Sequence, residues 1–139
     1  MIDWLLRDRP GVRMPRIRNF AFDCADPYAL AQFWAQVMGQ AVDSDSQPGD
    51  EEVGIRLPNS QALYFQRVPE PKTVKNRTHI CLEPEEFRDA DVDRVIELGA
   101  AFVADHRNAD GTGWVVLADP EGNEFCILRG TAERANAHQ

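Results

Sequence analysis

The sequence contains a weak internal repeat, and this repeat restricts the folds open to the chain more than any other feature. Corresponding residues recur sixty positions apart: Asn19 and His79, Gly39 and Gly99, Phe65 and Phe125, Gln66 and Cys126. Each half begins with an apolar run, continues with a helical pattern that ends in glycine, and closes with a run containing phenylalanine. A module repeated once can fold as two pseudo-symmetric halves around a shared cavity. Side chains that face this cavity should then occur in pairs sixty positions apart.

The first half predicts the element order β-α-β-β-β. Segment 16–23 has the composition of a strand, and Asp26-Pro27 is typical of a helix start with an N-cap acceptor. Apolar residues at helical spacing lead from there to Gly39, which we expect to be the C-cap. Further strands are predicted around Val42, over 53–57 and over 62–68.

The second half predicts the same order after a connector at 69–76. A strand over 77–82 precedes a helix with Asp89 as its N-cap and Gly99 at its end. Asp119-Pro-Glu-Gly122 has the residues of a type I turn, which should join the last two strands and account for Asp119 and Asn123. The remaining strands are predicted over 101–104, 113–118 and 123–128.

These patterns divide the chain into an N-terminal arm, one domain and a polar tail. The arm covers residues 1–14, and the small polar residues of the tail, 131–139, predict a frayed end. The domain covers 15–130 and consists of the modules 15–69 and 76–130, a size that suits a single core.

The composition excludes several classes of function. The formal net charge of −8 argues against binding to nucleic acid or to an anionic membrane surface. No apolar run approaches the length of about 20 residues that a membrane span needs. The three cysteines show no CxxC spacing, and we therefore expect a reduced, cytoplasmic protein.

Strand alternation sorts the side chains of the predicted strands into two faces. One face is uniformly apolar and should lie under the helices: Phe20, Phe22, Leu63, Phe65, Ile80, Leu82, Phe125 and Ile127. The other face is largely polar: Asn19, Ala21, Asp23, Tyr64, Gln66, His79, Cys81, Glu124 and Cys126. This second face predicts the wall of a solvent-accessible cup.

Several motifs together resemble a known family. They are Asp26-Pro, Phe33-Trp34, Met38-Gly39, Asn76-Arg-Thr-His79, Leu98-Gly-Ala100 and Asp119-Pro-Glu-Gly-Asn-Glu-Phe125. Over roughly residues 15–129 the chain resembles the glyoxalase/bleomycin-resistance group of the vicinal oxygen chelate superfamily, and more narrowly its short glyoxalase-like domain proteins. The resemblance implies an α+β fold in which two tandem β-α-β-β-β modules form a curled mixed sheet, a half-barrel cup with helices on its convex face. It also implies a homodimer, because half-barrels of this family often complete each other across chains.

The same resemblance implies the position of a metal site. Metal-dependent members take one ligand from the first strand and one from the last strand of each module, which corresponds here to Asn19, Gln66, His79 and Cys126. Family enzymes generally present His, Glu or Gln at these positions, whereas this chain has no carboxylate there. The possible cofactor is a divalent metal ion (Zn, Ni, Mn or Fe), and the Cys–His pair is best suited to Zn²⁺.

Individual residues then receive candidate roles. His79 and Glu124 are the candidate catalytic residues, with Asp23 as an alternative base. The candidate ligand-binding residues are Tyr64, Gln66, His79, Trp114 and Cys126. Each also has a structural interpretation: His79 as a hydrogen-bonded pocket residue, Cys126 as a buried thiol, Glu124 and Asp23 as solvated carboxylates. Trp34 is expected in the core between helix and sheet, and Trp114 in either the core or the pocket wall.

Three classes of function fit these features. The first, which we favour, is a small-molecule binding protein that sequesters its ligand in the cup, as resistance proteins do, and has a degenerate metal site. The second is a metal-dependent lyase, isomerase or dioxygenase that acts on a substrate with vicinal oxygens. The third is a non-catalytic partner or regulatory domain. The sequence leaves open whether the protein is an enzyme.

Overall fold

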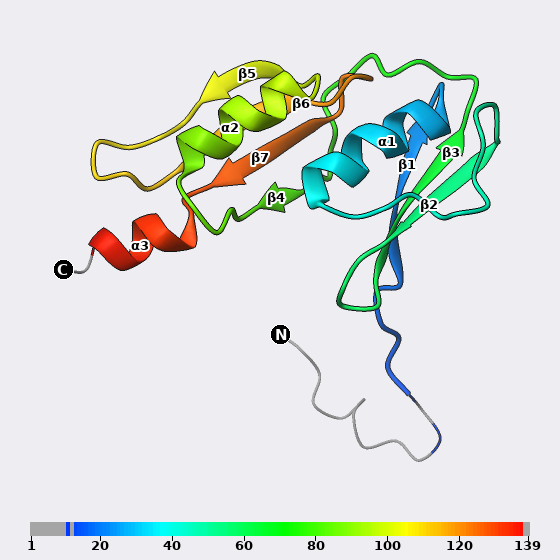
Figure 1. The fold of residues 1–139 in the computed structure, drawn as a ribbon, viewed down its shortest axis with the longest axis horizontal. Helices are drawn as coiled ribbons and strands as arrows, with labels where there is room; N and C mark the ends of the chain where they lie inside the picture. The colour runs from blue at the N-terminus through cyan, green and yellow to red at the C-terminus, as the bar shows by residue number, and fades with distance from the viewer. Residues whose placement is uncertain (1–10, 12, 138–139) are drawn as a thin grey trace.

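The computed structural model describes residues 11 and 13–137, and their strands form two separate hydrogen-bonded sheets, each with a helix packed against it (Figure 1). The first module consists of β1 (Asn19–Cys24), α1 (Pro27–Met38), β2 (Glu52–Arg56) and β3 (Ala62–Arg67). Its strand order is β1-β3-β2, with β1 parallel and β2 antiparallel to β3. The predicted N-terminal arm lies almost entirely outside the described residues.

The second module is longer and has a four-stranded sheet. It consists of β4 (Cys81–Leu82), α2 (Arg88–Glu97), β5 (Ala101–Asp105), β6 (Trp114–Ala118) and β7 (Glu124–Leu128), followed by α3 (Thr131–Ala137). Its order is β4-β7-β6-β5, with β4 parallel to β7 and the other pairs antiparallel. The predicted α+β fold of two tandem modules is confirmed, and the sheets are open.

The apolar faces of both sheets and the helices form one core. Leu63, Phe65, Phe125 and Ile127 are each at most 2% exposed, as the strand alternation predicts. The helix signals are confirmed for α1, where the Asp26 side chain accepts from the Ala29 N–H and Gly39 ends the helix in the left-handed conformation, with a φ of 63°. The apolar stripe of α1 is buried against the core: Leu30, Phe33, Trp34 and Val37.

Two predicted strands are shorter than the sequence indicates. The predicted strand around Val42 is a single bridge to Ile55, so the first module has three strands rather than four. The predicted strand over 77–82 is reduced to β4, although the Cys126 N–H also donates to the Ile80 carbonyl at 2.9 Å. Both corrections concern edge segments, which have a hydrogen-bonding neighbour on one side only.

The C-terminal segment forms a helix, which corrects the prediction of a frayed tail. The Glu133 carboxylate of α3 accepts the backbone N–H of Arg88 at 2.9 Å and that of Gly130 at 2.7 Å. Glu133 therefore caps α2, which begins after Phe87 without a side-chain cap of its own. Asp89, the predicted N-cap, forms an ion pair with Arg107 instead.

The turn between β6 and β7 connects the two modules. Asp119 is 3% exposed, and its carboxylate accepts from the Trp34 indole N–H of α1 at 3.0 Å as well as from the backbone N–H of Asn123 within the turn. The Glu121 carboxylate accepts the backbone N–H of Ala25 and that of Asp26, just before α1. Turn chemistry alone therefore does not account for Asp119, because this residue also anchors the fully buried Trp34.

Candidate functional site

A cavity of about 850 Å³ lies between the two modules. One wall is β1, which is at the edge of its sheet and contributes every residue from Asn19 to Asp23. Another is segment 78–80, just before β4, which is likewise an edge strand. The connector and the start of β7 close the remaining sides: Val68, Glu70, Pro71, Lys72, Asn76, Asn123, Glu124 and Phe125, together with Trp34 of α1.

Some predicted site residues line this cavity and others do not. Asn19, Asp23, His79 and Glu124 line it, whereas Gln66 and Cys126 are absent from its walls. Tyr64 instead borders a smaller acidic depression, where the Glu52 carboxylate raises its pKa. Trp114 is 45% exposed and packs beside His106, with 5.5 Å between ring centroids. It therefore lies neither in the core nor at the cavity.

Glu124 is held by the connector. Its carboxylate accepts from the Lys72 ammonium at 2.9 Å and from the Asn76 N–H at 3.0 Å. Burial opposes ionisation of this carboxyl group, but these hydrogen bonds outweigh burial and lower its pKa to about 2. A carboxylate stabilised in this way is a weak base, and its partners indicate that it fastens the connector to β7.

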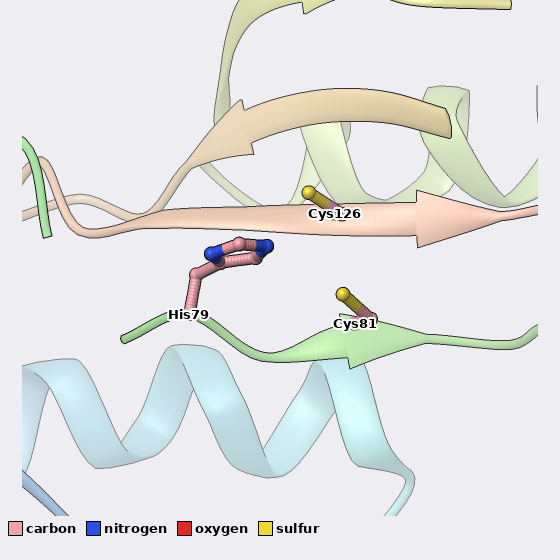
Figure 2. Close-up of side chains that lie close together, drawn as sticks. All are labelled: His79, Cys81 and Cys126. Carbon is pink, nitrogen blue, oxygen red and sulfur yellow. The ribbon is translucent and has the colours of Figure 1, made fainter. Parts of the chain in front are cut away.

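A second group of reactive side chains lies next to the cavity. His79, Cys81 and Cys126, which we name the thiol–imidazole cluster, have potential ligand atoms that all lie within 4.8 Å of one another. Figure 2 shows that His79 lies on the segment that leads into β4, Cys81 on β4 itself, and Cys126 on the neighbouring β7. His79 and Cys81 are exposed, whereas Cys126 is buried. His79 belongs to both the cluster and the cavity wall.

The strand register brings these three side chains together. Cys81 directly opposes Cys126 in the parallel pairing of β4 with β7. His79 precedes Cys81 by two positions, and residues two apart in an extended chain share a face. Burial, followed by the nearby Cys81, raises the pKa of the Cys126 thiol to about 11, so that this thiol is protonated at neutral pH.

The corresponding residues of the first module are not brought together. Gln66 opposes Asp23, whereas Asn19, four positions away along β1, opposes Ala62. At a rise of about 3.3 Å per residue, Asn19 and Gln66 are separated by roughly 13 Å along the strands. A metal site that uses all four family positions stays a prediction, and only the second module brings its two predicted donors close to one another.

The donor types decide which metal could fit. Mg²⁺ and Mn²⁺ prefer carboxylate, carbonyl and water oxygens, whereas thiolates favour softer ions such as Zn²⁺. The thiol–imidazole cluster offers two sulfur atoms and one imidazole. An oxygen-preferring ion therefore does not fit this cluster.

Sequence reasoning missed three residues of this region. Strand alternation assigns Cys81 to the same face as His79, but its sixty-residue partner Ala21 carries no reactive group and no family position draws attention to it. Lys72 and Asn76 lie in the connector, and their contacts with Glu124 depend on how this segment folds back over β7. The Asn76-Arg-Thr-His79 motif was the one available signal.

Solved structures with the same fold include proteins of several activities. A variant of the fosfomycin resistance protein FosX from Listeria monocytogenes, complexed with Mn(II) and 1S,2S-dihydroxypropylphosphonic acid, is 14% identical with a TM-score of 0.65, covering 92% of this chain and all (100%) of that one. A glyoxalase/bleomycin resistance protein/dioxygenase family enzyme from Burkholderia phytofirmans is 21% identical with a TM-score of 0.60, covering 78% and 94%. The oxidase ChaP-H2 is 23% identical with a TM-score of 0.61, covering 84% and 94%. At these identities the similarity shows a common fold.

The sequence itself identifies the family. None of the curated proteins matches the chain significantly. The profile of the glyoxalase-like domain family matches residues 19–128, from the first residue of β1 to the last residue of β7. The match covers both modules, and the chain therefore belongs to the glyoxalase-like domain family.

Proposed function

We propose that this protein binds a small molecule in the cavity between its modules and holds it without chemical change, as a resistance-type protein does. The cavity is the observation that supports this function. Its volume of about 850 Å³ lies in the usual range for ligand sites, about 300–1,000 Å³. Small-molecule sites typically combine apolar walls with a few polar groups that orient the ligand.

The lining indicates the chemistry of the ligand. Phe20, Phe22 and Phe125 offer ring surfaces, and Phe20 is 37% exposed although its cross-strand partner Leu63 is buried. Asn19 and His79 offer hydrogen-bonding groups on opposite walls. Lys72 is paired with Glu124, and the other charged lining residues, Asp23 and Glu70, are acidic, so we expect an uncharged or cationic ligand with an aromatic or aliphatic body and polar substituents.

A thermal-shift screen with recovery of the ligand tests this function. We expect one class of compound to raise the melting temperature and to be recovered with its mass unchanged. Ala21→Phe, on the cavity wall, should abolish the shift, whereas Ala101→Phe, on the exposed β5, should leave it intact. Conversion of the bound compound, or an equal response of the two variants, would contradict sequestration in this cavity.

The second candidate is a metal-dependent lyase, isomerase or dioxygenase that acts on a substrate with vicinal oxygens. The thiol–imidazole cluster beside the cavity favours it, and the FosX structure, which contains Mn(II), is an example of a metal-containing protein with this fold. Elemental analysis of protein purified without chelator, followed by assays with Ni²⁺, Zn²⁺, Mn²⁺ and Fe²⁺, tests this activity. Absence of metal and absence of activation would remove this candidate.

The expected homodimer and the cytoplasmic location belong to the same proposal. The edge of β1 beside the cavity supports a dimer, since an unpaired strand edge can accept a strand of a second chain. Light scattering after size-exclusion chromatography would show a mass of twice 15.7 kDa. Three free cysteines suit a reducing compartment. Among the described residues, no helix combines the length and the apolar character needed to cross a membrane.

A further inference from the structure

Backbone pairing places Cys81 and Cys126 of the thiol–imidazole cluster side by side, and His79 lies two residues before Cys81. Cys81 and Cys126 are direct partners in the pairing of β4 with β7, and the hydrogen bond from the Cys126 N–H to the Ile80 carbonyl extends this pairing toward His79. Neighbouring strands lie about 4.8 Å apart, so the side-chain torsions of Cys81 and Cys126 decide how closely their sulfur atoms approach. The fold therefore gathers these three donors whether or not an ion is bound.

The donor atoms lie close enough together for small side-chain rotations to bring them to one tetrahedral ion. Zn–S bonds of about 2.3 Å and Zn–N bonds of about 2.0–2.1 Å place tetrahedral donors roughly 3.5–3.8 Å apart. The donor atoms of the cluster already lie within 4.8 Å of one another. Rotation about side-chain bonds can close the remaining difference, because His79 and Cys81 are exposed and free to adjust.

We propose that His79, Cys81 and Cys126 form a site for a thiophilic divalent ion of the Zn²⁺ type. The essential addition is Cys81, which the family pattern does not include and which adds a second sulfur donor beside Cys126. As the ion binds, each thiol releases its proton to solvent and the sulfur coordinates as a thiolate. Mn²⁺ and other oxygen-preferring ions are excluded by the same donors.

The proposed site leaves one coordination position free beside the ligand cavity. Three protein ligands leave one place free on a four-coordinate ion, the arrangement typical of zinc sites that also bind water or a substrate. His79 is common to the cluster and the cavity wall, so an ion held by the cluster borders the cavity. This inference goes beyond the proposed sequestration, which needs no metal, and either one can fail without the other.

Metal titration of the reduced, metal-free protein tests the site without any substrate. Zn²⁺ affinity is measured by competition with a chromophoric chelator, and Co²⁺ serves as a spectroscopic substitute. We expect one Zn²⁺ per chain, a sulfur-to-cobalt charge-transfer band, and no Mn²⁺ binding at the same concentration. A Co²⁺ spectrum without this band, or Mn²⁺ that binds as tightly as Zn²⁺, would overturn the proposal.

Cysteine variants locate the site. Cys81→Ser and Cys126→Ser should each weaken Zn²⁺ binding by about tenfold or more, since even the loss of an outer-shell partner costs 10- to 100-fold. Cys24→Ala is the matched control, because Cys24 is a buried free cysteine outside the cluster. Cys81 is exposed, so its variant should fold normally, which circular dichroism verifies. Unchanged affinity and an unchanged Co²⁺ spectrum in Cys81→Ser would refute the assignment.

Discussion

The two modules share a plan but differ in how their strands are paired. In the second module Cys81 opposes Cys126, forty-five positions later, whereas in the first Asp23 opposes Gln66, forty-three positions later. The pairing is thus displaced by two residues between modules whose sequences align at a constant offset of sixty. Side chains keep their face after such a shift, but they acquire different neighbours across the strand. Equivalent sequence positions therefore need not be equivalent positions in space.

As a consequence, the two modules contribute different features: one gathers the possible metal donors and the other supplies a cavity wall. The second module brings His79, Cys81 and Cys126 together, whereas the first module keeps Asn19 and Gln66 apart. The first module instead contributes β1, with its aromatic side chains, as a wall of the cavity. The modules are nevertheless coupled, because the turn that begins at Asp119 belongs to the second and anchors α1 of the first. The first predictions below test the contact between the modules, and the last one tests whether only the second module binds metal.

We expect the largest effect from Asp119→Ala. This substitution removes the acceptor of the buried Trp34 indole N–H and of the turn N–H of Asn123. Buried donors without partners cost about 1–3 kcal/mol each, although deletion of a carboxylate whose pKa is raised by burial recovers part of the loss. The free energy of unfolding should fall by about 3 kcal/mol, as measured by urea denaturation.

Trp34→Phe serves as the partner in a double-mutant cycle. If Asp119 and Trp34 couple the modules, the double variant should be less destabilised than the sum of the two single variants. Strict additivity would show that Asp119 acts only within its own turn.

Glu124→Gln should have the second largest effect and should change the pH dependence. The pKa of Glu124 is lowered from 4.5 to about 2, so its ionised form stabilises the folded state at pH values above about 4.5. This contribution is lost as the pH falls from about 4.5 toward 2. The variant should lose about 2 kcal/mol at neutral pH and show a flatter decline of stability in acid.

The exposed Glu97 provides the control for this pH profile. Glu97→Gln removes a carboxylate of the same type from α2, outside the connector. Its acid denaturation should follow that of the unmodified protein. A steep acid decline that persists in Glu124→Gln would assign the pH dependence to other carboxylates.

A smaller effect is expected for Glu133→Ala, which removes one of the contacts between α3 and the rest of the second module. The backbone N–H groups of Arg88 and Gly130 lose their common acceptor, and loss of such a cap costs about 1 kcal/mol. Asn136→Ala, at an exposed position of the same helix, should change stability very little. Equal losses in both variants would indicate helix propensity rather than the cap.

The sequence predicted local elements well and contacts between distant elements poorly. Asp26-Pro27 and Gly39 delimit α1 correctly because capping depends on a few neighbouring residues. Strand alternation likewise placed His79, Cys81 and Cys126 on one face, because alternation depends only on the position of a residue within its own strand. The β1–β3 register, the cap that Glu133 provides and the contact of Asp119 with Trp34 each depend on segments far apart in the chain. No local pattern encodes such contacts, and the repeat partner of Cys81, Ala21, has no reactive side chain that would single out this position.

The last prediction compares the two modules by their contribution to Zn²⁺ affinity, and we expect substitutions in the first module to have almost no effect on it. Asn19→Ala and Gln66→Ala should leave Zn²⁺ affinity within about twofold, because their side chains lie outside the cluster and roughly 13 Å apart along the strands. His79→Ala, at the position that repeats Asn19, should weaken Zn²⁺ binding by about tenfold or more. Asn19→Ala should still weaken binding of a cavity ligand, since Asn19 lines the cavity. Loss of Zn²⁺ affinity in Asn19→Ala or Gln66→Ala would mean that the four family positions meet around one ion, across the modules or across a dimer, and that the register of the isolated chain does not describe the assembled site.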